Sequence, residues 1–376
     1  MLQWRMENGD GIRFLKKLNL ITRDLFIINL CEISKDQAAE IELTKKDIFC
    51  LSLTWSKDIF QLPEPVHNDE IEVFEALHPP TNIKYGRLNC YPGEYLPSWC
   101  HGSYDPTIFS SLTEIMVIGC PKLSSLEQFL QPAYMPAIKI MMIKECTSLE
   151  SIPVERFGGL PSLEELKVTN CPKINSQCLL APSLKKLSLE DPGNLENDID
   201  CRSLTTINLS NYHLASLTFN REKLPLLTEL TIGECRELET LNGGWPILKS
   251  LSIMLCPRLK WENGIVLPSS LQSLHLWDRG YFSVRCLENL TSLNSLVMTV
   301  CKHIEYIPRD LWSSNLKSLQ KLTIKHCEDV VSIGGQEVIA HIPKVDIQNC
   351  PNLKEVQQPL LRGYPFRFRF FSCNKL

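Results

Sequence analysis

Short aliphatic segments recur at regular intervals along the chain and set its pattern of hydrophobic and polar positions. In the repeating unit, an aliphatic residue is followed three, five and eight positions later by two more aliphatic residues and a cysteine, as at Leu227, Leu230, Ile232 and Cys235. Aliphatic residues two positions apart point to the same side of a β-strand, and the residues between them point to the other side. The eight cysteines in the last position, called the ladder cysteines below, are Cys120, Cys146, Cys171, Cys235, Cys256, Cys301, Cys327 and Cys350.

The unit repeats almost from end to end once the cysteine is allowed to vary. Most copies follow the previous one after roughly 20–26 residues, which is typical of the leucine-rich repeat, L-x-x-L-x-L-x-x-N/C-x-L. A weaker copy passes through Leu25, Ile27 and Leu30, and the longest steps lie on either side of Ile83. Complete or near-complete copies begin at Ile48, Ile83, Leu112, Ile138, Leu163, Leu184, Leu204, Leu227, Leu248, Leu271, Leu293, Leu319 and Ile342.

This pattern predicts an α/β fold, a leucine-rich repeat solenoid (horseshoe) with a parallel β-sheet on its concave face and loops or short helices on its convex face. One turn cannot bury its own inward aliphatic residues, whereas stacked turns bury them against each other. Prolines such as Pro121, Pro153 and Pro257 fall in the connections, where a missing backbone donor is tolerated. Ser34 and Gln37 have the spacing of a capping box and predict a short helix.

The repeat spacing divides the chain into four segments. Residues 1–20 are an N-terminal lead-in, and residues 21–111 carry N-terminal repeats with longer insertions. Residues 112–356 hold the regular cysteine-type repeats, and residues 357–376 form a C-terminal tail that leaves the repeat frame. We expect the tail to be frayed or loosely packed.

The ladder position favours a small residue that turns inward just past each strand, and a buried thiol suits it. The chain has 16 cysteines but no C-x-x-C pair, no histidine at metal-ligand spacing and no signal peptide. We therefore expect reduced, structural thiols and a cytoplasmic location. Disulfides between neighbouring turns are the alternative, because stacking brings successive ladder cysteines close together.

Composition and motifs give no support to catalysis. A hydrophobic content of 44% and a net charge of −4 are ordinary for a soluble protein and do not indicate a nucleic-acid partner. No run of eighteen apolar residues predicts a membrane span. The chain has no G-x-S-x-G elbow, H-E-x-x-H pair or G-x-x-x-x-G-K-[ST] phosphate loop. We expect no enzymatic activity, no cofactor and no metal site.

The N-terminal third adds a more specific succession of segments. They are Leu30-Cys-Glu-Ile33, Asp36-Gln-Ala-Ala39, Leu43-Thr-Lys-Lys46, Leu51-Ser-Leu-Thr-Trp-Ser56, Val73-Phe-Glu-Ala-Leu77, His78-Pro-Pro-Thr-Asn-Ile83 and Tyr91-Pro-Gly-Glu-Tyr-Leu-Pro-Ser-Trp99. This succession resembles the leucine-rich region of the coiled-coil type of plant intracellular nucleotide-binding disease resistance proteins. The later C-P-x-L units, at Cys120, Cys256 and Cys350, are similar to the distal repeats of the same receptors, so the resemblance covers roughly residues 15 to 356.

The resemblance implies the protein-recognition module of a plant innate immune receptor, active in the defense response. Such a module senses a pathogen effector or makes an autoinhibitory contact. Its expected partners are proteins, namely a pathogen effector, a host guardee or the receptor's own nucleotide-binding module. Since those receptors carry an ATPase switch ahead of the repeats and this chain has no phosphate loop, we expect a repeat-only or partial gene product.

Three other interpretations stay open. The repeat domain of a ubiquitin-ligase adaptor also uses cysteine-rich repeats, but it requires an F-box-like helical segment that the sequence does not show. An extracellular receptor requires a signal peptide and favours asparagine at the ladder position. A truncated receptor fragment without function is the third.

Alternation along each predicted strand also selects the residues that point out of the sheet. Large apolar side chains on a soluble surface often mark partner sites, so we predict that the concave face binds protein. The predicted contact residues are Tyr85, Arg87, Met116, Ile118, Ile140, Met142, Met254, His275, Trp277 and Val297, with Lys321, Lys325 and Lys344 forming a basic end.

Overall fold

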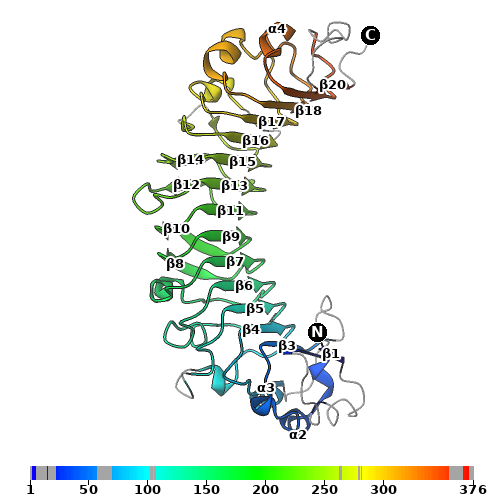
Figure 1. Ribbon diagram of the computed structural model, residues 1–376, viewed down its shortest axis with the longest axis vertical. Helices are drawn as coiled ribbons and strands as arrows, with labels where there is room; N and C mark the ends of the chain where they lie inside the picture. The colour runs from blue at the N-terminus through cyan, green and yellow to red at the C-terminus, as the bar shows by residue number, and fades with distance from the viewer. Residues whose placement is uncertain are drawn as a thin grey trace. The chain divides into compact units, whose positions relative to one another are not determined.

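Strands of five residues form wherever the aliphatic pattern is complete. The computed structural model describes residues 2–5, 15, 23–56, 70–101, 105, 107–261, 265–277, 280, 282–354 and 367–371. The chain divides into unit 1, residues 1–204, and unit 2, residues 205–376. Figure 1 shows strands stacked one above the next in each unit. One strand together with its return segment is called a rung below.

Unit 1 contains one main sheet in the order β1-β2-β3-β4-β5-β6-β7-β9. Its strands are β1 Leu2–Arg5, β2 Asp24–Ile28, β3 Cys50–Thr54, β4 Tyr85–Asn89, β5 Glu114–Ile118, β6 Ile140–Lys144, β7 Glu165–Thr169 and β9 Lys186–Glu190. A separate parallel pair is formed by β8 (Asn175–Leu180) and β10 (Asn194–Asp200).

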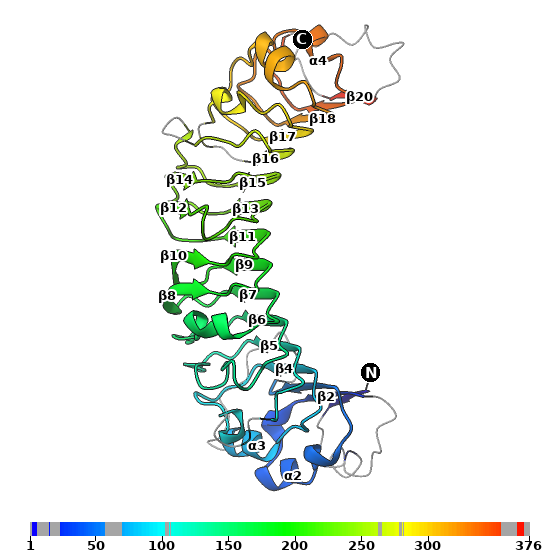
Figure 2. The same cartoon turned by 60° about the vertical axis from the view of Figure 1, so that its left-hand side comes forward.

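Unit 2 contains a main sheet in the order β11-β13-β15-β16-β17-β18-β19-β20. Its strands are β11 Thr206–Ser210, β13 Glu229–Gly233, β15 Ser250–Met254, β16 Ser273–Trp277, β17 Ser295–Thr299, β18 Lys321–Lys325, β19 Lys344–Gln348 and β20 Arg367–Phe371. A second parallel pair is formed by β12 (Ser216–Phe219) and β14 (Thr240–Gly243). Figure 2 follows the same strands from another side.

Helical segments in the described residues are short and lie in the return segments. The α-helices are α2 Lys35–Ala39, α3 Glu70–Ala76 and α4 Gln336–Ile339. The 3₁₀ turns are η1 Leu30–Glu32, η2 Leu43–Lys45, η3 Ser98–Cys100, η4 Val154–Gly159 and η6 Val284–Leu287, and Leu311–Asn315 forms a π-helical turn. The predicted capping box of α2 is confirmed, with Ser34 and Gln37 each bonding the other's backbone N–H.

The main sheets confirm the predicted parallel sheet and every repeat frame from Leu25 to Ile342. Neighbouring strands pair in parallel without offset, for example Leu230 with Leu251 and Ile232 with Ile253. All four side chains are at most 1% exposed. Stacking therefore buries what a single turn leaves open.

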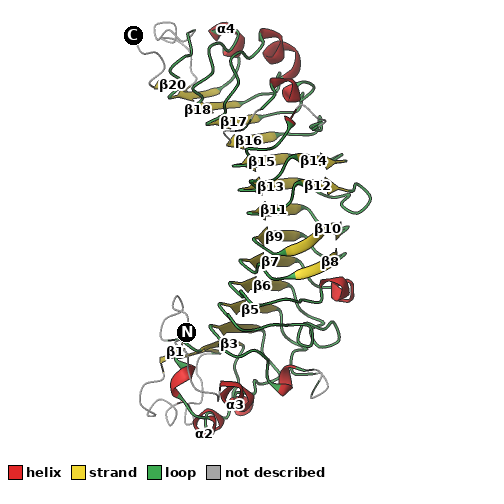
Figure 3. Cartoon of the chain, turned by 180° about the vertical axis from the view of Figure 1, so that it is seen from behind, coloured by secondary structure: helices red, strands yellow, loops and turns green. Residues whose placement is uncertain are grey.

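Three sets of strands were not predicted. Strand β1 lies in the lead-in, and β20 lies in the tail and pairs in parallel with β19, so the expectation of a loosely packed end is wrong for residues 367–371. The pairs β8–β10 and β12–β14 lie on the return side of their rungs (Figure 3). Their sequences break the aliphatic alternation, and neighbouring return segments lie close enough to pair without it.

A residue in the left-handed region follows almost every described strand. Glu234 has φ 55° and Asn211 has φ 50°. Their backbone N–H groups donate to the carbonyl of the next rung, Glu234 to Met254 at 2.8 Å and Asn211 to Gly233 at 3.0 Å. This turn directs the next residue, which is the ladder residue, into the interior.

The ladder cysteines close the inner end of each strand. The Cys235 thiol donates to the carbonyl of Gly233 at 3.3 Å. The Cys350 thiol donates to its own rung at Gln348 and lies within reach of the preceding rung at Ile324, at 3.4 and 3.8 Å. All eight ladder side chains are at most 2% exposed, and no disulfide joins the cysteines within the described residues. The thiol therefore links neighbouring rungs while filling a small interior site.

The insertions near the N-terminus are packed by an aromatic cluster in unit 1. Phe74 of α3 meets Trp55, Tyr91 and Trp99 edge to face, with ring centroids 5.0 to 5.2 Å apart. Tyr91 occupies the ladder position after β4 and is fully buried. Edge-to-face pairs stabilise beyond the area they bury, so the long insertions add to the core.

A small apolar cavity lies beside this cluster, at an inward position that holds glycine. Gly86 pairs in register with Leu51 and Ile115, and both of those side chains are buried. The cavity has a volume of about 60 Å³ and is lined almost entirely by apolar atoms, Phe74 and Trp99 among them. Gly86 lines this space, but a Cβ added there would meet the Ile115 side chain at 3.1 Å.

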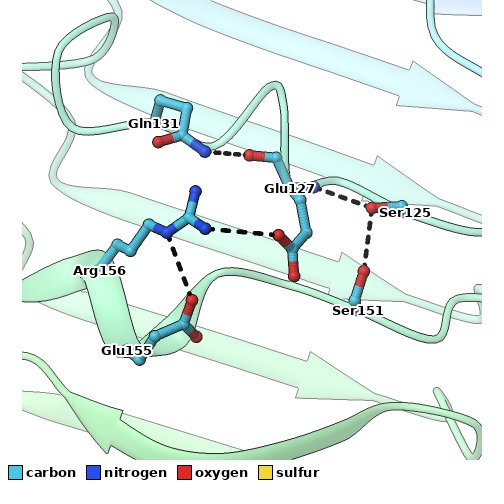
Figure 4. A network of polar contacts seen from close by, with 6 residues as sticks. All are labelled: Ser125, Glu127, Gln131, Ser151, Glu155 and Arg156. Atoms are coloured by element: carbon cyan, nitrogen blue, oxygen red, sulfur yellow. Dashed lines mark hydrogen bonds and ion pairs between the residues drawn. The ribbon is translucent and has the colours of Figure 1, made fainter.

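Polar contacts join rungs on the return side as well (Figure 4). The Ser125 and Ser151 hydroxyls lie 3.0 Å apart in an isolated parallel bridge. Arg156 lies between Glu127 and Glu155, at 3.8 and 3.5 Å. These ion pairs are about half exposed and contribute little to stability.

We expect substitution of the ladder to destabilise the protein without changing any chemistry. Cys235→Ala should lower the free energy of unfolding by about 1 kcal/mol, and Leu230→Ala by about 2–5 kcal/mol because it removes more buried volume. Both values can be measured by urea denaturation followed by circular dichroism.

Thiol labelling gives a second measurement. A hydrogen bond with the Cys301 thiol, together with burial, raises the pKa of Cys327 to about 12, and a protonated thiol reacts slowly. All eight ladder thiols are at most 2% exposed. In the native protein they should therefore label more slowly than the partly exposed Cys178 and Cys286, and in denaturant they should label fully. Native ladder thiols that label as fast as Cys286 would contradict this assignment.

Candidate protein-recognition face

The first, third and fifth residues of each strand form the solvent side of the two main sheets, called the open face below. All thirteen predicted contact residues lie on this face, and none of them is buried. Tyr85 and Trp277 are each 43% exposed. The strand alternation predicted from the sequence is therefore confirmed at these positions, while their role in binding stays a prediction.

In unit 1, the structure brings six of the predicted residues together across β4, β5 and β6. Arg87, Met116 and Met142 are register neighbours on successive strands. Tyr85, Ile118 and Ile140 occupy first or fifth positions on the same strands. Figure 1 shows these three strands side by side. This set is called the unit 1 patch.

The open face is covered at β3. Ser52 and Thr54 on β3 and Asn89 on β4 point to the open side but are at most 5% exposed. The Asn89 side-chain amide donates to both hydroxyls, at 3.1 and 3.0 Å. These bonds satisfy the buried polar groups. Strand β2 is partly exposed on this face, and the face is accessible again from Tyr85 and Arg87 onward.

In unit 2, four predicted residues gather on β15, β16 and β17. Met254 pairs in register with Trp277, and His275 pairs with Val297. The adjoining first positions hold small hydroxyl residues, Ser273 among them. The set Met254, His275, Trp277 and Val297 is called the unit 2 patch.

The predicted basic end is partly neutralised by an acidic residue. Lys321 and Lys344 are exposed and pair in register. Lys325 forms an ion pair with Asp346 at 3.0 Å, with both side chains about 30% exposed. The positive charge that a partner meets is therefore concentrated at Lys321 and Lys344.

Two partly or fully exposed apolar residues just past the strands were missed by the strand alternation. Leu255 and Val300 follow β15 and β17 in the left-handed region, with φ of 54° and 59°. Leu255 is 39% exposed. The sequence does mark these two positions. The residue before the ladder cysteine is polar or glycine in every other ladder rung, and aliphatic only here.

The described residues include no group of three potential metal ligands and no helix long and apolar enough to cross a bilayer. Burial raises the pKa of Cys286 to about 11 and that of Cys201 to about 12, so neither thiol is activated. What the open face offers is contact area.

Comparison with sequence families matches residues 12–146 to a family described as R13L1/DRL21 LRRs. Disease resistance protein RPS4B of Arabidopsis thaliana is 26% identical over 242 residues, 62% of this chain and 18% of that protein. Putative disease resistance protein RGA4 of Solanum bulbocastanum is 27% identical over 297 residues, 76% of this chain and 23% of that protein. The chain is similar over much of its length to plant disease resistance proteins.

The leucine-rich repeat fold also has solved counterparts. The structure titled "Crystal structure of TLR13-ssRNA13 complex" superposes with a TM-score of 0.52 at 14% identity, and the match covers 96% of this chain and 55% of that one. At this identity the likeness shows the solenoid fold alone. The curated relatives are far longer, because the chain spans about a fifth of the length of RPS4B or RGA4.

The left-handed backbone at Val300 predicts a stabilising substitution. A β-branched residue is strained there, at a cost of about 1–2 kcal/mol, while the Val300 N–H bond to Lys325 is independent of the side chain. Val300→Asn should raise the free energy of unfolding by about 1 kcal/mol. The reciprocal control, Asn211→Val, should lower it, and a loss of stability in Val300→Asn would refute the assignment of strain.

His275 predicts a pH dependence of stability in unit 2. Burial and, second, the Lys321 charge lower the pKa of His275 below 6.5. The unfolded chain then binds the proton more readily than the folded chain, so stability should fall as the pH drops below 6.5. Urea denaturation gives the free energy of unfolding at about pH 7.5 and at about pH 5.5. The difference between these two values should be smaller in His275→Gln than in the parent protein, and also smaller in Lys321→Gln. Equal differences in His275→Gln and the parent would exclude this residue as the cause.

Proposed function

We propose that this chain is the protein-recognition module of a plant innate immune receptor and acts in the cytoplasm. It recognises a pathogen effector or a host guardee, or makes an autoinhibitory contact with a receptor nucleotide-binding module. The observation that carries the proposal is the open face, where the unit 1 and unit 2 patches expose large apolar side chains in strand register. The relationship to disease resistance proteins supports the immune setting.

The mechanism is recognition rather than catalysis. Each strand fixes its outward side chains every second position, because the inward ones are held in the core. A partner therefore meets a rigid array that needs little ordering on binding, which favours affinity. Protein is preferred over nucleic acid as the partner, because both patches are mainly apolar and the chain carries a net charge of −4.

Site-specific photo-crosslinking tests this proposal. A photoreactive amino acid placed at Met142 or Trp277, in protein expressed in leaves challenged with a pathogen, should give a discrete crosslinked protein. The controls are Tyr95 and Tyr306, which are 66% and 61% exposed and lie outside the open face. They are more exposed than Trp277, at 43%, so exposure alone would favour them. Crosslinks confined to the control positions would refute recognition through the open face.

A further inference from the structure

The residues that follow the main-sheet strands in the left-handed region are called the left-handed row below. Its two aliphatic members lie on either side of one exposed tryptophan. Leu255 follows β15 and Val300 follows β17, while Trp277 ends β16 between them. The Leu255 N–H donates to the Trp277 carbonyl at 2.8 Å, and Met254 is the register partner of Trp277. Met254, Leu255, Trp277 and Val300 are apolar residues at the ends of three successive strands, and the four are called the ledge below.

The ledge combines strain with exposure. In the other described rungs, the left-handed residue after the strand is Asn, Asp, Glu, Gly, His or Cys. Leucine and valine are unfavourable in this conformation, and the exposed part of Leu255 gains nothing from the core. Strained residues persist where surrounding structure imposes them, and they cluster at ligand-contacting sites. The ledge is the place on unit 2 where strain and exposed apolar surface coincide.

Positive charge begins at the next rungs. Lys321 on β18 is the register neighbour of Lys344 on β19, and Arg367 holds the corresponding register position on β20. Like charges on neighbouring strands repel each other. From β11 to β17, Glu229 is the one carboxylate among the open-face side chains that the structure describes. The positions in line with Trp277 hold Lys325, which is paired with Asp346, and Gln348. A partner that runs obliquely from the ledge to the first positions of β18 and β19 therefore meets the positive charge of Lys321 and Lys344.

We propose that the ledge and the two lysines bind one extended segment of a partner protein, in which apolar residues are followed by acidic ones. This inference rests on the proposed function and adds the chemistry of the partner. Strands lie about 4.8 Å apart and an extended chain advances about 3.3 Å per residue. Lys321 and Lys344 hold the first strand position, whereas Trp277 holds the fifth, so the two lysines lie about 16 and 20 Å from Trp277 along the sheet. An extended segment that runs obliquely from Trp277 to Lys344 then has about seven residues, with apolar side chains at one end and carboxylates at the other.

A peptide is favoured over single-stranded nucleic acid, although both carry negative charge. Nucleic-acid grooves stack successive bases on several aromatic side chains. The ledge has one aromatic ring, and its other three members are the aliphatic or thioether side chains of Met254, Leu255 and Val300. Such a surface fits leucine-like or aromatic side chains of a peptide and offers a base only one stacking position.

The experiment pans a display library of random heptapeptides against the full chain. The expected result is enrichment of peptides with two apolar residues followed by Asp or Glu. Selected peptides are then synthesised with a fluorescent label, and their Kd is measured by anisotropy at low and high salt. The charge contacts predict weaker binding at high salt.

Matched variants locate the binding. Trp277→Ala should raise the Kd of the selected peptide at least tenfold, as expected for a central aromatic contact. Tyr306→Ala should leave this Kd unchanged. Lys321→Glu combined with Lys344→Glu should also raise it at least tenfold. The control Lys317→Glu reverses an exposed charge between strands and should have little effect.

The left-handed row supplies a readout that a structural role would not give. Leu255→Asn combined with Val300→Asn should raise the melting temperature of the protein and, at the same time, raise the Kd of the peptide. A higher melting temperature with unchanged Kd would show that the two residues do not contact the ligand and would overturn the proposal.

The remaining outcomes are also decisive. Enriched peptides that lack acidic residues, or that respond to Met142→Ala and not to Trp277→Ala, would overturn the ledge while leaving open-face recognition in place. Tighter, Trp277-dependent binding of a labelled single-stranded RNA than of any selected peptide would replace the peptide proposal. Failure to enrich any peptide would count against the ledge, while the crosslinking experiment would judge the open face independently.

Discussion

The hydrogen bond from the residue after a main-sheet strand to the next rung's carbonyl is the constraint on which the other features depend. At most of these residues it accompanies a left-handed backbone, as at Glu234 and Asn211. The turn sends the following side chain inward, which places a cysteine such as Cys235 where its thiol can cap the strand's last carbonyls. Because the bond uses only backbone atoms, the left-handed residue's own side chain remains available for display. The same turn therefore creates both the interior ladder and a row of surface positions.

The sequence was most informative where burial is strict. The pair Leu230 and Ile232 recurs because a parallel rung allows only inward aliphatic residues at those positions, so the frames, the strands and the open-face alternation could all be predicted. Ser52 has the correct alternation but is buried, since local alternation does not show whether a face is covered. Strand β20 escaped prediction because the repeat frame had ended, and β8–β10 because its pairing depends on neighbouring return segments rather than on a pattern within either strand. Leu255 and Val300 could be identified only by comparing the residue before the ladder cysteine in all rungs, which an analysis of single strands does not do.

Stability and recognition use alternate residues of the same strands. On β16, Leu274 and Leu276 are at most 3% exposed, while Trp277 is 43% exposed. Replacing an outward residue leaves the inward register intact, because successive side chains point to opposite faces. The two patches can therefore differ in chemistry without disturbing the core. The unit 1 patch combines methionine and isoleucine with Arg87. The unit 2 patch places Trp277 and His275 beside several serines. This separation explains how one repeating backbone can present different surfaces along its length.

The apolar cavity beside the aromatic cluster has a consequence for the response to hydrostatic pressure. Unfolding fills internal voids with water, so pressure favours the opening of whichever region contains them. The cavity of about 60 Å³ next to β4 is a gap of this kind. Compression should therefore loosen unit 1 around β4 and the surrounding aromatic rings before rungs whose inward positions are filled, such as those of Leu187 and Leu166. The weakest point of the stack under pressure would then lie among its largest side chains.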